Sequence, residues 1–419
     1  MKTITTKRIL LSASVSVIAC MGSYTAHAAG FYIQEQSVSG LGNAYAGQVA
    51  TPRDASIVYY NPAGMTKLSG SHVYAGTHIL APSANLKDTG SSAAFGGATG
   101  GKGGNPYSAT PIPNFHMSHE VVENTFWLGL SVSAPFGLSN EYKEGWFGRF
   151  DSTETALQTI DFQPSFAVRV NDKLSVGGGM NIQHADVDIK KVINQGAGER
   201  NSTLEGNTTT VGFNVGVLYE PIDGTTLGAH YRSGVHHHVD GNIVIDNNGT
   251  VTSSTVASAE LNLPEIVQLG VNHKVNDRLS LQAGATWFGW NSFEEIRVLN
   301  AAGGLVANTT QNYQTTWAFA VGGEYLLNDE WTLRAGYQFD ETPTTDEYRT
   351  TLTPDGDRHW VSAGATYKFN DKIDIDLAAT YVDIASEEID VARNGGLATV
   401  KADTGGHVAI FSLGVNYKF

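Results

Sequence analysis

Residues 407–419, H-V-A-I-F-S-L-G-V-N-Y-K-F, end the chain on an alternating pattern. Residues two apart share one face of a β-strand, so this segment has one continuous apolar face. That face comprises Ala409, Phe411, Leu413, Val415, Tyr417 and Phe419, opposite Ser412, Gly414, Asn416 and Lys418. An apolar strand that ends the chain on an aromatic residue is typical of the closing strand of an outer-membrane β-barrel. Closure requires that strand to be paired, because lipid leaves no alternative partner for its backbone.

The first 28 residues have the pattern of a secretory signal peptide. Basic residues precede an apolar run at 9–21, and the small residues Ala26 and Ala28 stand at the cleavage positions. We therefore expect residues 1–28 to be removed and the mature chain to start at Ala29. A lipoprotein with a lipidated Cys20 is the weaker alternative, because Ile18 is bulky for that type of cleavage box.

The composition of the mature chain excludes several classes of protein. Cys20 is the single cysteine, so removal of the signal peptide excludes disulfides and cysteine-based metal or redox sites, and we expect no cofactor. The signal peptide takes three basic residues with it, which leaves 23 basic against 41 acidic residues and a net charge of −18. This charge argues against nucleic acid as a partner. No apolar run after residue 28 is long enough for a transmembrane helix.

The mature sequence divides into two parts. Residues 29–70 are rich in Gly and Ala and do not alternate, which suits a plug of short helices, or hatch. From 71 to 419 a two-residue period predominates, which predicts an all-β transmembrane barrel of antiparallel strands. Short Asn/Asp turns at one end alternate with longer loops at the other. The fourteen expected strands cover residues 71–80, 112–119, 125–134, 157–170, 173–193, 206–220, 225–246, 256–275, 278–299, 311–327, 330–340, 357–370, 372–385 and 405–419.

Several short motifs are spread over the mature chain, at residues 29–31, 39–47, 61–63, 261–265 and 358–366. Their order and spacing resemble those of the FadL-type long-chain fatty acid transporters of the outer membrane. The resemblance implies a fourteen-stranded barrel plugged by an N-terminal hatch. It also implies that hydrophobic molecules are carried inward and released sideways through the wall. We expect a monomer that contacts outer-membrane lipid and lipopolysaccharide.

A break in the wall is expected after the third strand. Pro135 cannot donate to the sheet, and Gly137 marks a bend or a close approach. The simplest alternative is that the strand ends there. By resemblance, Gly137 falls where the third strand of the family kinks inward, so we expect a lateral opening at this point.

The segment after the break is rich in large apolar side chains. Phe136, Leu138, Trp146, Phe147 and Phe150 are unusual in a loop exposed to water, and such a patch normally marks a binding surface. The resemblance places a first-contact groove here. Alternatively, the rings pack on each other only to hold the loop.

The hatch supplies the candidate gate. Phe31 is close to the new N-terminus, and in the resembled family this end reaches the ligand pocket. Asn61, Pro62 and Ala63 end the hatch where it meets the wall, where Pro62 restricts φ and Asn61 can bond local backbone, which suggests a hinge. An ordinary turn is the alternative.

The substrate is ambiguous from the sequence. A buried carboxylate needs a cation or several donors. By resemblance, Lys191 falls on or beside the basic ligand residue, with Lys190 next to it, although a solvated lysine is equally compatible. Residues 309–314 lack the second lysine of fatty acid carriers. Long-chain fatty acid is therefore the leading substrate and a neutral aromatic or alkane hydrocarbon is the alternative, with a general porin weaker still.

Two motifs resemble a nucleotide-binding loop and a metal site but are not expected to have these functions, and an enzyme is not expected. Residues 96–103 nearly match a P-loop, but Gly103 stands where a Ser or Thr must bind magnesium. His236, His237 and His238 are adjacent, so on a strand they cannot converge on one metal. A barrel hydrolase would need a nucleophile elbow, which the sequence lacks.

Overall fold

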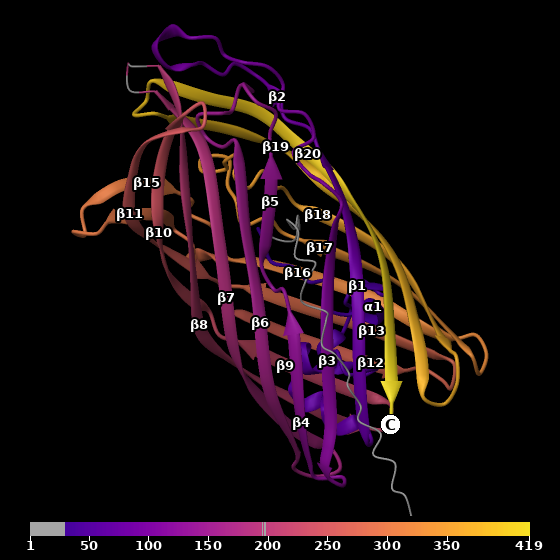
Figure 1. Ribbon diagram of the computed structural model, residues 1–419. Helices are drawn as coiled ribbons and strands as arrows, with labels where there is room; N and C mark the ends of the chain where they lie inside the picture. The colour runs from indigo at the N-terminus through magenta and orange to yellow at the C-terminus, as the bar shows by residue number, and fades with distance from the viewer. Residues whose placement is uncertain (1–29, 195, 197) are drawn as a thin grey trace, which may run out of the picture.

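The computed structural model describes residues 30–194, 196 and 198–419, so the predicted signal peptide and Ala29 lie outside the described residues. The chain forms one sheet whose strands are all antiparallel neighbours (Figure 1). The strand segments are β1 (Ser71–Ala84), β2 (Lys87–Asp88), β3 (Thr110–Val122), β4 (Phe126–Ser133), β5 (Gly137–Glu141), β6 (Glu154–Arg169), β7 (Leu174–Asn194), β8 (Glu199–Ile222), β9 (Thr225–Arg232), β10 (Val235–Asn247), β11 (Thr250–Leu263), β12 (Ile266–Lys274), β13 (Leu279–Phe288), β14 (Glu295–Asn300), β15 (Leu305–Thr310), β16 (Thr316–Leu326), β17 (Trp331–Asp340), β18 (Arg358–Lys368), β19 (Ile373–Arg393) and β20 (Ala398–Lys418).

The sheet closes on itself because β1 pairs with β20 on one side and with β3 on the other. Five strands of the barrel are each broken into two consecutive segments, namely β4/β5, β9/β10, β11/β12, β13/β14 and β15/β16. The short segment β2 pairs only with β20 and adds no strand to the ring. Within the described residues the barrel therefore has fourteen strands, which confirms the prediction. Four of these five breaks contain a proline or a glycine that interrupts the ladder, for example Gly234 and Pro264, whereas the break between β15 and β16 contains neither. The last two strands extend well past their expected ends at 385 and 405.

The two faces of the wall have the alternation that the sequence predicts. On β6, Phe162 is 44% exposed and faces outward, whereas Asp161 and Gln163 are fully buried and face the lumen. On β20, Phe411 is exposed and Asn416 is buried. The barrel thus has an apolar exterior and a polar interior, the reverse of a soluble protein.

Short helical turns lie inside the ring of strands (Figure 1). They are α1 (Val38–Leu41), η1 (Gln48–Ala50), α2 (Ile57–Tyr60) and η2 (Pro62–Lys67), with η3 (Ala94–Gly96) and η4 (Trp290–Ser292) outside this segment. Residues 30–69, called here the N-terminal segment, contact strands around the ring, namely β1, β3, β4, β6 to β9, β12 and β18 to β20. No helix in the described part of the chain is long and apolar enough to span a bilayer.

Inward-facing glycines allow the N-terminal segment to approach the wall closely. A Cβ atom at Gly336 would collide with the carbonyl oxygen of Asn43, and one at Gly228 would collide with that of Val49. Larger side chains at these positions would push the segment away from the strands. The tight fit explains why nearly all of the segment is buried.

Candidate functional site

The N-terminal segment supplies hydrogen-bond partners at the predicted break in the third strand. The Ile33 amide donates to the Pro135 carbonyl oxygen (2.8 Å), and the Gly137 amide donates to the Phe31 carbonyl oxygen (2.9 Å). The Gln36 side-chain amide donates to the Ala134 carbonyl oxygen (3.0 Å). Backbone groups that a neighbouring strand would normally satisfy are therefore satisfied by residues 31–36.

The ladder between the second and third strands is incomplete at this point. On one side, residues 110–119 of β3 pair with β1. On the other side, β3 pairs with β4 only from Phe115 onward, so residues 110–114 have a neighbouring strand on one side alone. β5 pairs with β6, and the described residues form no ladder between β5 and β3. The expected kink at Pro135 and Gly137 is thus a real interruption of pairing in the wall.

An apolar cavity, called here the wall cavity, occupies this interruption. It contains about 730 Å³ of space, its open mouth included. It is lined by Ile33, Ile112, Pro113, Asn114, Phe115, Val132, Ser133, Ala134, Phe136, Gly137, Leu157, Gln158 and Ile160. Phe115 is one of the outward-facing residues, so the wall cavity reaches the apolar exterior.

A second apolar cavity, called here the lumen cavity, lies inside the barrel and contains about 720 Å³, its mouth included. It is lined by Phe31, Leu138, Thr155, Ala156, Leu157, Val187, Ile189, Leu204, Glu205, Gly206, Val239, Gly241, Ala257, Ala259, Glu260, Leu261, Phe293, Ile296, Gln311, Leu352 and Thr353. Leu157 lines both cavities.

Phe31 sits in a cluster of aromatic rings beside the lumen cavity. Its ring centroid is 4.7 Å from that of Trp290, 5.4 Å from Phe293, 6.2 Å from Phe136 and 6.5 Å from Tyr313. Three of these pairs are edge-to-face, the arrangement that aromatic quadrupoles favour. The structure therefore brings Phe31, Phe136 and Leu138 into one apolar cluster, although the sequence analysis assigns Phe31 to the gate and the other two to a first-contact groove. It adds the ring of Trp290, which carried no sequence signal.

The structure does not bring the two candidate lysines to either cavity. The Lys190 ammonium is 2.7 Å from a Glu154 carboxylate oxygen and 3.6 Å from one of Asp188. Lys191 follows on the same strand and lines neither cavity. Their role in binding a carboxylate stays a prediction.

The aromatic residues of the loop after β5 are not exposed, so the expectation of an apolar patch in water is wrong. Trp146 is fully buried, and Phe147 and Phe150 are nearly so. Tyr142 stacks on Trp146 with centroids 3.8 Å apart. The extended ends of β19 and β20 cover the loop with Ile389, Val391, Val400 and Ala402. The alternative, that these rings hold the loop, fits this packing, and any contact with ligand stays a prediction.

Asn61 connects the N-terminal segment to the wall. Its side-chain amide donates to the carbonyl oxygens of Val49 (2.8 Å) and Val217 (3.0 Å), and its side-chain oxygen accepts from the Ala63 amide (3.1 Å). Pro62 begins η2 at a position where a missing N–H costs nothing. Asn61, Pro62 and Ala63 lie away from both cavities, and their action as a hinge stays a prediction.

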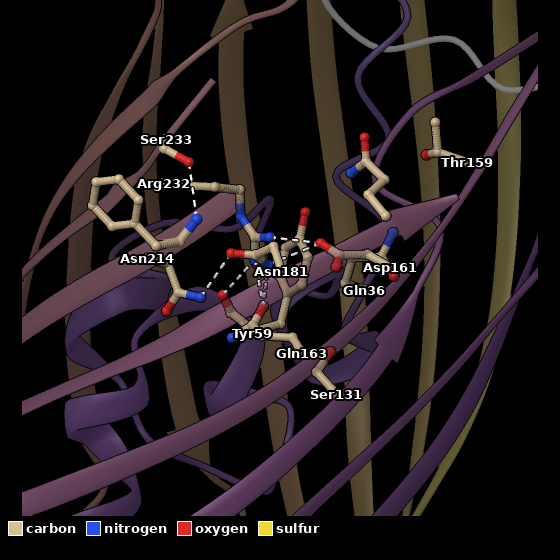
Figure 2. A network of polar contacts seen from close by, with 12 residues as sticks. Gln36, Tyr59, Ser131, Thr159, Asp161, Gln163, Asn181, Asn214, Arg232 and Ser233 are labelled. Atoms are coloured by element: carbon tan, nitrogen blue, oxygen red, sulfur yellow. Dashed lines mark hydrogen bonds and ion pairs between the residues drawn. The ribbon is translucent and has the colours of Figure 1, made fainter. Parts of the chain in front are cut away.

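A buried ion pair beside Tyr59 was missed from the sequence. The Arg232 guanidinium is 2.9 Å from a carboxylate oxygen of Asp161, and it also donates to the Gln163 side-chain oxygen (2.7 Å) and to the Tyr59 carbonyl oxygen (3.2 Å) (Figure 2). Asn181 donates to the same Asp161 oxygen (2.9 Å). The signal that could have revealed this pair is the presence of opposite charges on the inward faces of two strands.

The side chains of the three adjacent histidines, residues 236–238, point in different directions. His236 and His238 face outward and bond Asn262 (2.9 Å) and Glu260 (2.6 Å). His237 is buried and bonds Gln183 (2.9 Å). This confirms that the three imidazoles do not converge. The glycine-rich segment at 96–103 forms no strand-loop-helix unit.

Comparisons with known proteins identify the family. Residues 19–419 match the model of the family described as "Outer membrane protein transport protein (OMPP1/FadL/TodX)". The chain is 27% identical over 455 residues to the long-chain fatty acid transport protein of Escherichia coli (strain K12), covering 99% of each chain. It superposes on the crystal structure of a Pseudomonas aeruginosa FadL homologue with a TM-score of 0.87 and 26% identity, covering 93% of this chain and all of that one.

The Ralstonia pickettii toluene transporter TbuX has the same fold, with a TM-score of 0.68 and 18% identity over 91% of this chain and 97% of that one. Its low identity supports the fold alone. The family match, the closed barrel and the apolar exterior agree on the same conclusion. The chain belongs to the OMPP1/FadL/TodX family, and it is a transport protein of the bacterial outer membrane rather than an enzyme.

Proposed function

We propose that this protein takes up long-chain fatty acids or similar hydrophobic molecules by capture in an apolar site, gating by the N-terminal segment and lateral release through the third strand. The observation that carries the proposal is the arrangement of the two apolar cavities. They share Leu157, and residues of the N-terminal segment stand at each of them, Phe31 at the lumen cavity and Ile33 at the wall cavity.

Lateral release is supported by the interruption at Pro135 and Gly137. A hydrophobic ligand that leaves through the wall passes directly into lipid and avoids the cost of re-entering water. At about 25 cal/mol per Å² of apolar surface, this cost would amount to several kcal/mol for a long alkyl chain.

Gating requires residues 31–33 to move, because they bond the edges of the interruption. Each backbone hydrogen bond contributes only about 0.5–1.5 kcal/mol net. A ligand that displaces Phe31 from the lumen cavity would therefore weaken the contacts at Pro135 and Gly137 together. Asn61, Pro62 and Ala63 would act as the fixed hinge of this motion.

Capture is assigned to Leu138 and Phe136, which line the lumen and wall cavities respectively. Trp146, Phe147 and Phe150 would support them by holding the loop. The monomeric state and the contacts with outer-membrane lipid and lipopolysaccharide stay predictions.

Neutral hydrocarbons are a second candidate substrate. None of the described residues that line the lumen cavity is Lys, Arg or His. A carboxylate buried there would lack a cation, whereas an uncharged ligand needs none. The proteins that this chain resembles include both a long-chain fatty acid transport protein and a toluene transporter. A general porin is weaker, because the N-terminal segment contacts the wall around the ring.

The test is a strain lacking this protein and the same strain carrying it on a plasmid, compared for uptake of oleate, toluene and an alkane. We expect uptake of at least one of these to depend on the protein, and single-channel conductance of the purified protein to be small. Uptake that is identical in both strains for all three compounds would contradict the proposed function. A large, constant conductance would indicate a porin.

A further inference from the structure

One polar side chain in the lumen cavity has an unpaired donor atom. Gln311 lies just after β15, is 2% exposed, and lines the cavity. Its side-chain nitrogen, Nε2, is buried and makes no hydrogen bond to any described residue. The backbone of Gln311 is held in place, because its amide donates to the Glu294 carbonyl oxygen (2.8 Å).

An unpaired donor in an apolar cavity is costly. Leaving a buried donor unsatisfied costs about 1–3 kcal/mol, and buried polar side chains normally have partners. A glutamine that served only to fill space could be replaced by leucine without this cost. The position of Nε2 therefore points to a hydrogen-bond acceptor on the ligand.

None of the described residues that line the lumen cavity carries a positive charge that could neutralise a charged acceptor on the ligand. Glu205 and Glu260 contribute to the lining but are exposed, and Glu260 is paired with His238 on the outer face. The buried guanidiniums of Arg358 and Arg349 do not line the cavity, and both form ion pairs, Arg358 with Asp355 and Asp340, and Arg349 with Asp346 and Glu387. A free carboxylate in the cavity would meet one amide donor and no opposite charge.

We propose that the lumen cavity selects uncharged amphiphiles, namely a long apolar chain with one terminal hydrogen-bond acceptor such as an ester or ketone carbonyl, and that Gln311 determines this specificity. The inference rests on the proposed function, because it takes the lumen cavity as the ligand site. The apolar lining binds the chain, and Nε2 donates to the carbonyl oxygen. A hydrocarbon without a polar group binds without this hydrogen bond. A carboxylate binds more weakly, because its charge would be buried without a counter-charge.

The experiment measures binding of radiolabelled methyl oleate, oleate at pH 8 and 1-octadecene to the purified full-length protein in detergent. We expect methyl oleate to bind about two- to tenfold more tightly than 1-octadecene, the equivalent of one net hydrogen bond. Oleate should bind more weakly than its methyl ester. In Gln311→Leu the preference for the ester over the alkene should disappear while alkene binding persists, and in Gln311→Lys oleate should become the preferred ligand.

Two controls keep the result interpretable. Gln314→Leu removes the same side chain from an exposed position three residues away and should leave all three affinities unchanged. Gln311→Met tests the loss of the donor with a different shape, should Gln311→Leu fail to fold as judged by heat-modifiable mobility in SDS gels.

The outcomes separate the two proposals. If the wild-type protein binds none of the three ligands, the proposed function fails, and this inference fails with it. If it binds all three equally, or if Gln311→Leu and Gln311→Met keep the preference for the ester, the role of Gln311 is overturned and transport of hydrophobic molecules stands. Tighter binding of oleate than of methyl oleate by the wild-type protein also overturns it.

Discussion

The two ends of the N-terminal segment are attached to the barrel wall by different chemistry. Near its end, Tyr59 and Asn61 meet the wall through the buried pair of Arg232 and Asp161 and through a side-chain amide that bonds β8. Near its start, residues 31–36 are held by backbone hydrogen bonds to the interrupted strand and by aromatic contacts.

This difference indicates which end can move. Removing one partner of a buried ion pair costs about 3–5 kcal/mol, because the other charge stays buried and unpaired. Breaking a backbone hydrogen bond costs about 1 kcal/mol net, because water or a new partner can replace it. We infer that the end beside Arg232 is an anchor and that the start beside Gly137 is displaceable by ligand.

The largest effect is expected from breaking the anchor. Asp161→Ala leaves the Arg232 guanidinium without its carboxylate and should lower the free energy of unfolding by about 3–5 kcal/mol. Urea unfolding of the purified protein in detergent micelles measures this. Lys401→Ala is the control, because it removes an ion pair at the surface with Asp390 (2.7 Å) and should cost at most about 1 kcal/mol. Equal losses in the two variants would show that the pair is not an anchor.

A smaller loss of stability with a complete loss of function is expected at the displaceable end. A Cβ atom at Gly137 would lie 2.9 Å from the Ile33 side chain, so Gly137→Leu should fill the interruption. Overpacking of this kind costs about 1–3 kcal/mol. We expect folded protein with abolished uptake of hydrophobic substrate.

The control for Gly137→Leu is Gly101→Leu, because a Cβ atom at Gly101 meets nothing within 4 Å. Uptake by Gly101→Leu should equal that of the wild-type protein. Normal uptake by Gly137→Leu would contradict release through this part of the wall.

The mildest change concerns Glu35, within the displaceable residues. This side chain is fully buried, and burial raises its pKa from 4.5 to about 8. Hydrogen bonds from the local backbone and the charge of Arg358 oppose this rise in pKa, whereas Asp340 adds to it. Between these two pH values the folded protein keeps the proton and the unfolded chain loses it. Stability should therefore fall as the pH rises from about 4.5 to about 8.

Glu35→Gln has the shape of the protonated carboxyl and cannot ionise. It should remove this part of the pH dependence and leave uptake at neutral pH unchanged. Thermal unfolding of both proteins between these pH values is the measurement. An unaltered pH dependence in Glu35→Gln would mean that Glu35 does not titrate in the folded barrel.

Much of the barrel could be predicted from the sequence, because strand faces follow from a local period of two. The apolar series ending at Phe419 is outward-facing in the structure, and the strands lie where the pattern places them. The exposure of Trp146, Phe147 and Phe150 could not be predicted, because their cover comes from β19 and β20, more than 200 residues later in the chain. Gln311 had no local signal at all, since only its surroundings make it unusual.

The sequence by itself determined the closed barrel with an apolar exterior, the polar lumen and the interruption at Pro135 and Gly137. Each follows from the identity of neighbouring residues, through side-chain alternation or a missing backbone donor. Only the tertiary structure decided that Asp161 meets Arg232, that Phe31 enters a ring of aromatic side chains, and that Gln311 faces an apolar cavity without a partner. These contacts join residues that are far apart in the chain, and they depend on the register and closure of the whole ring of strands.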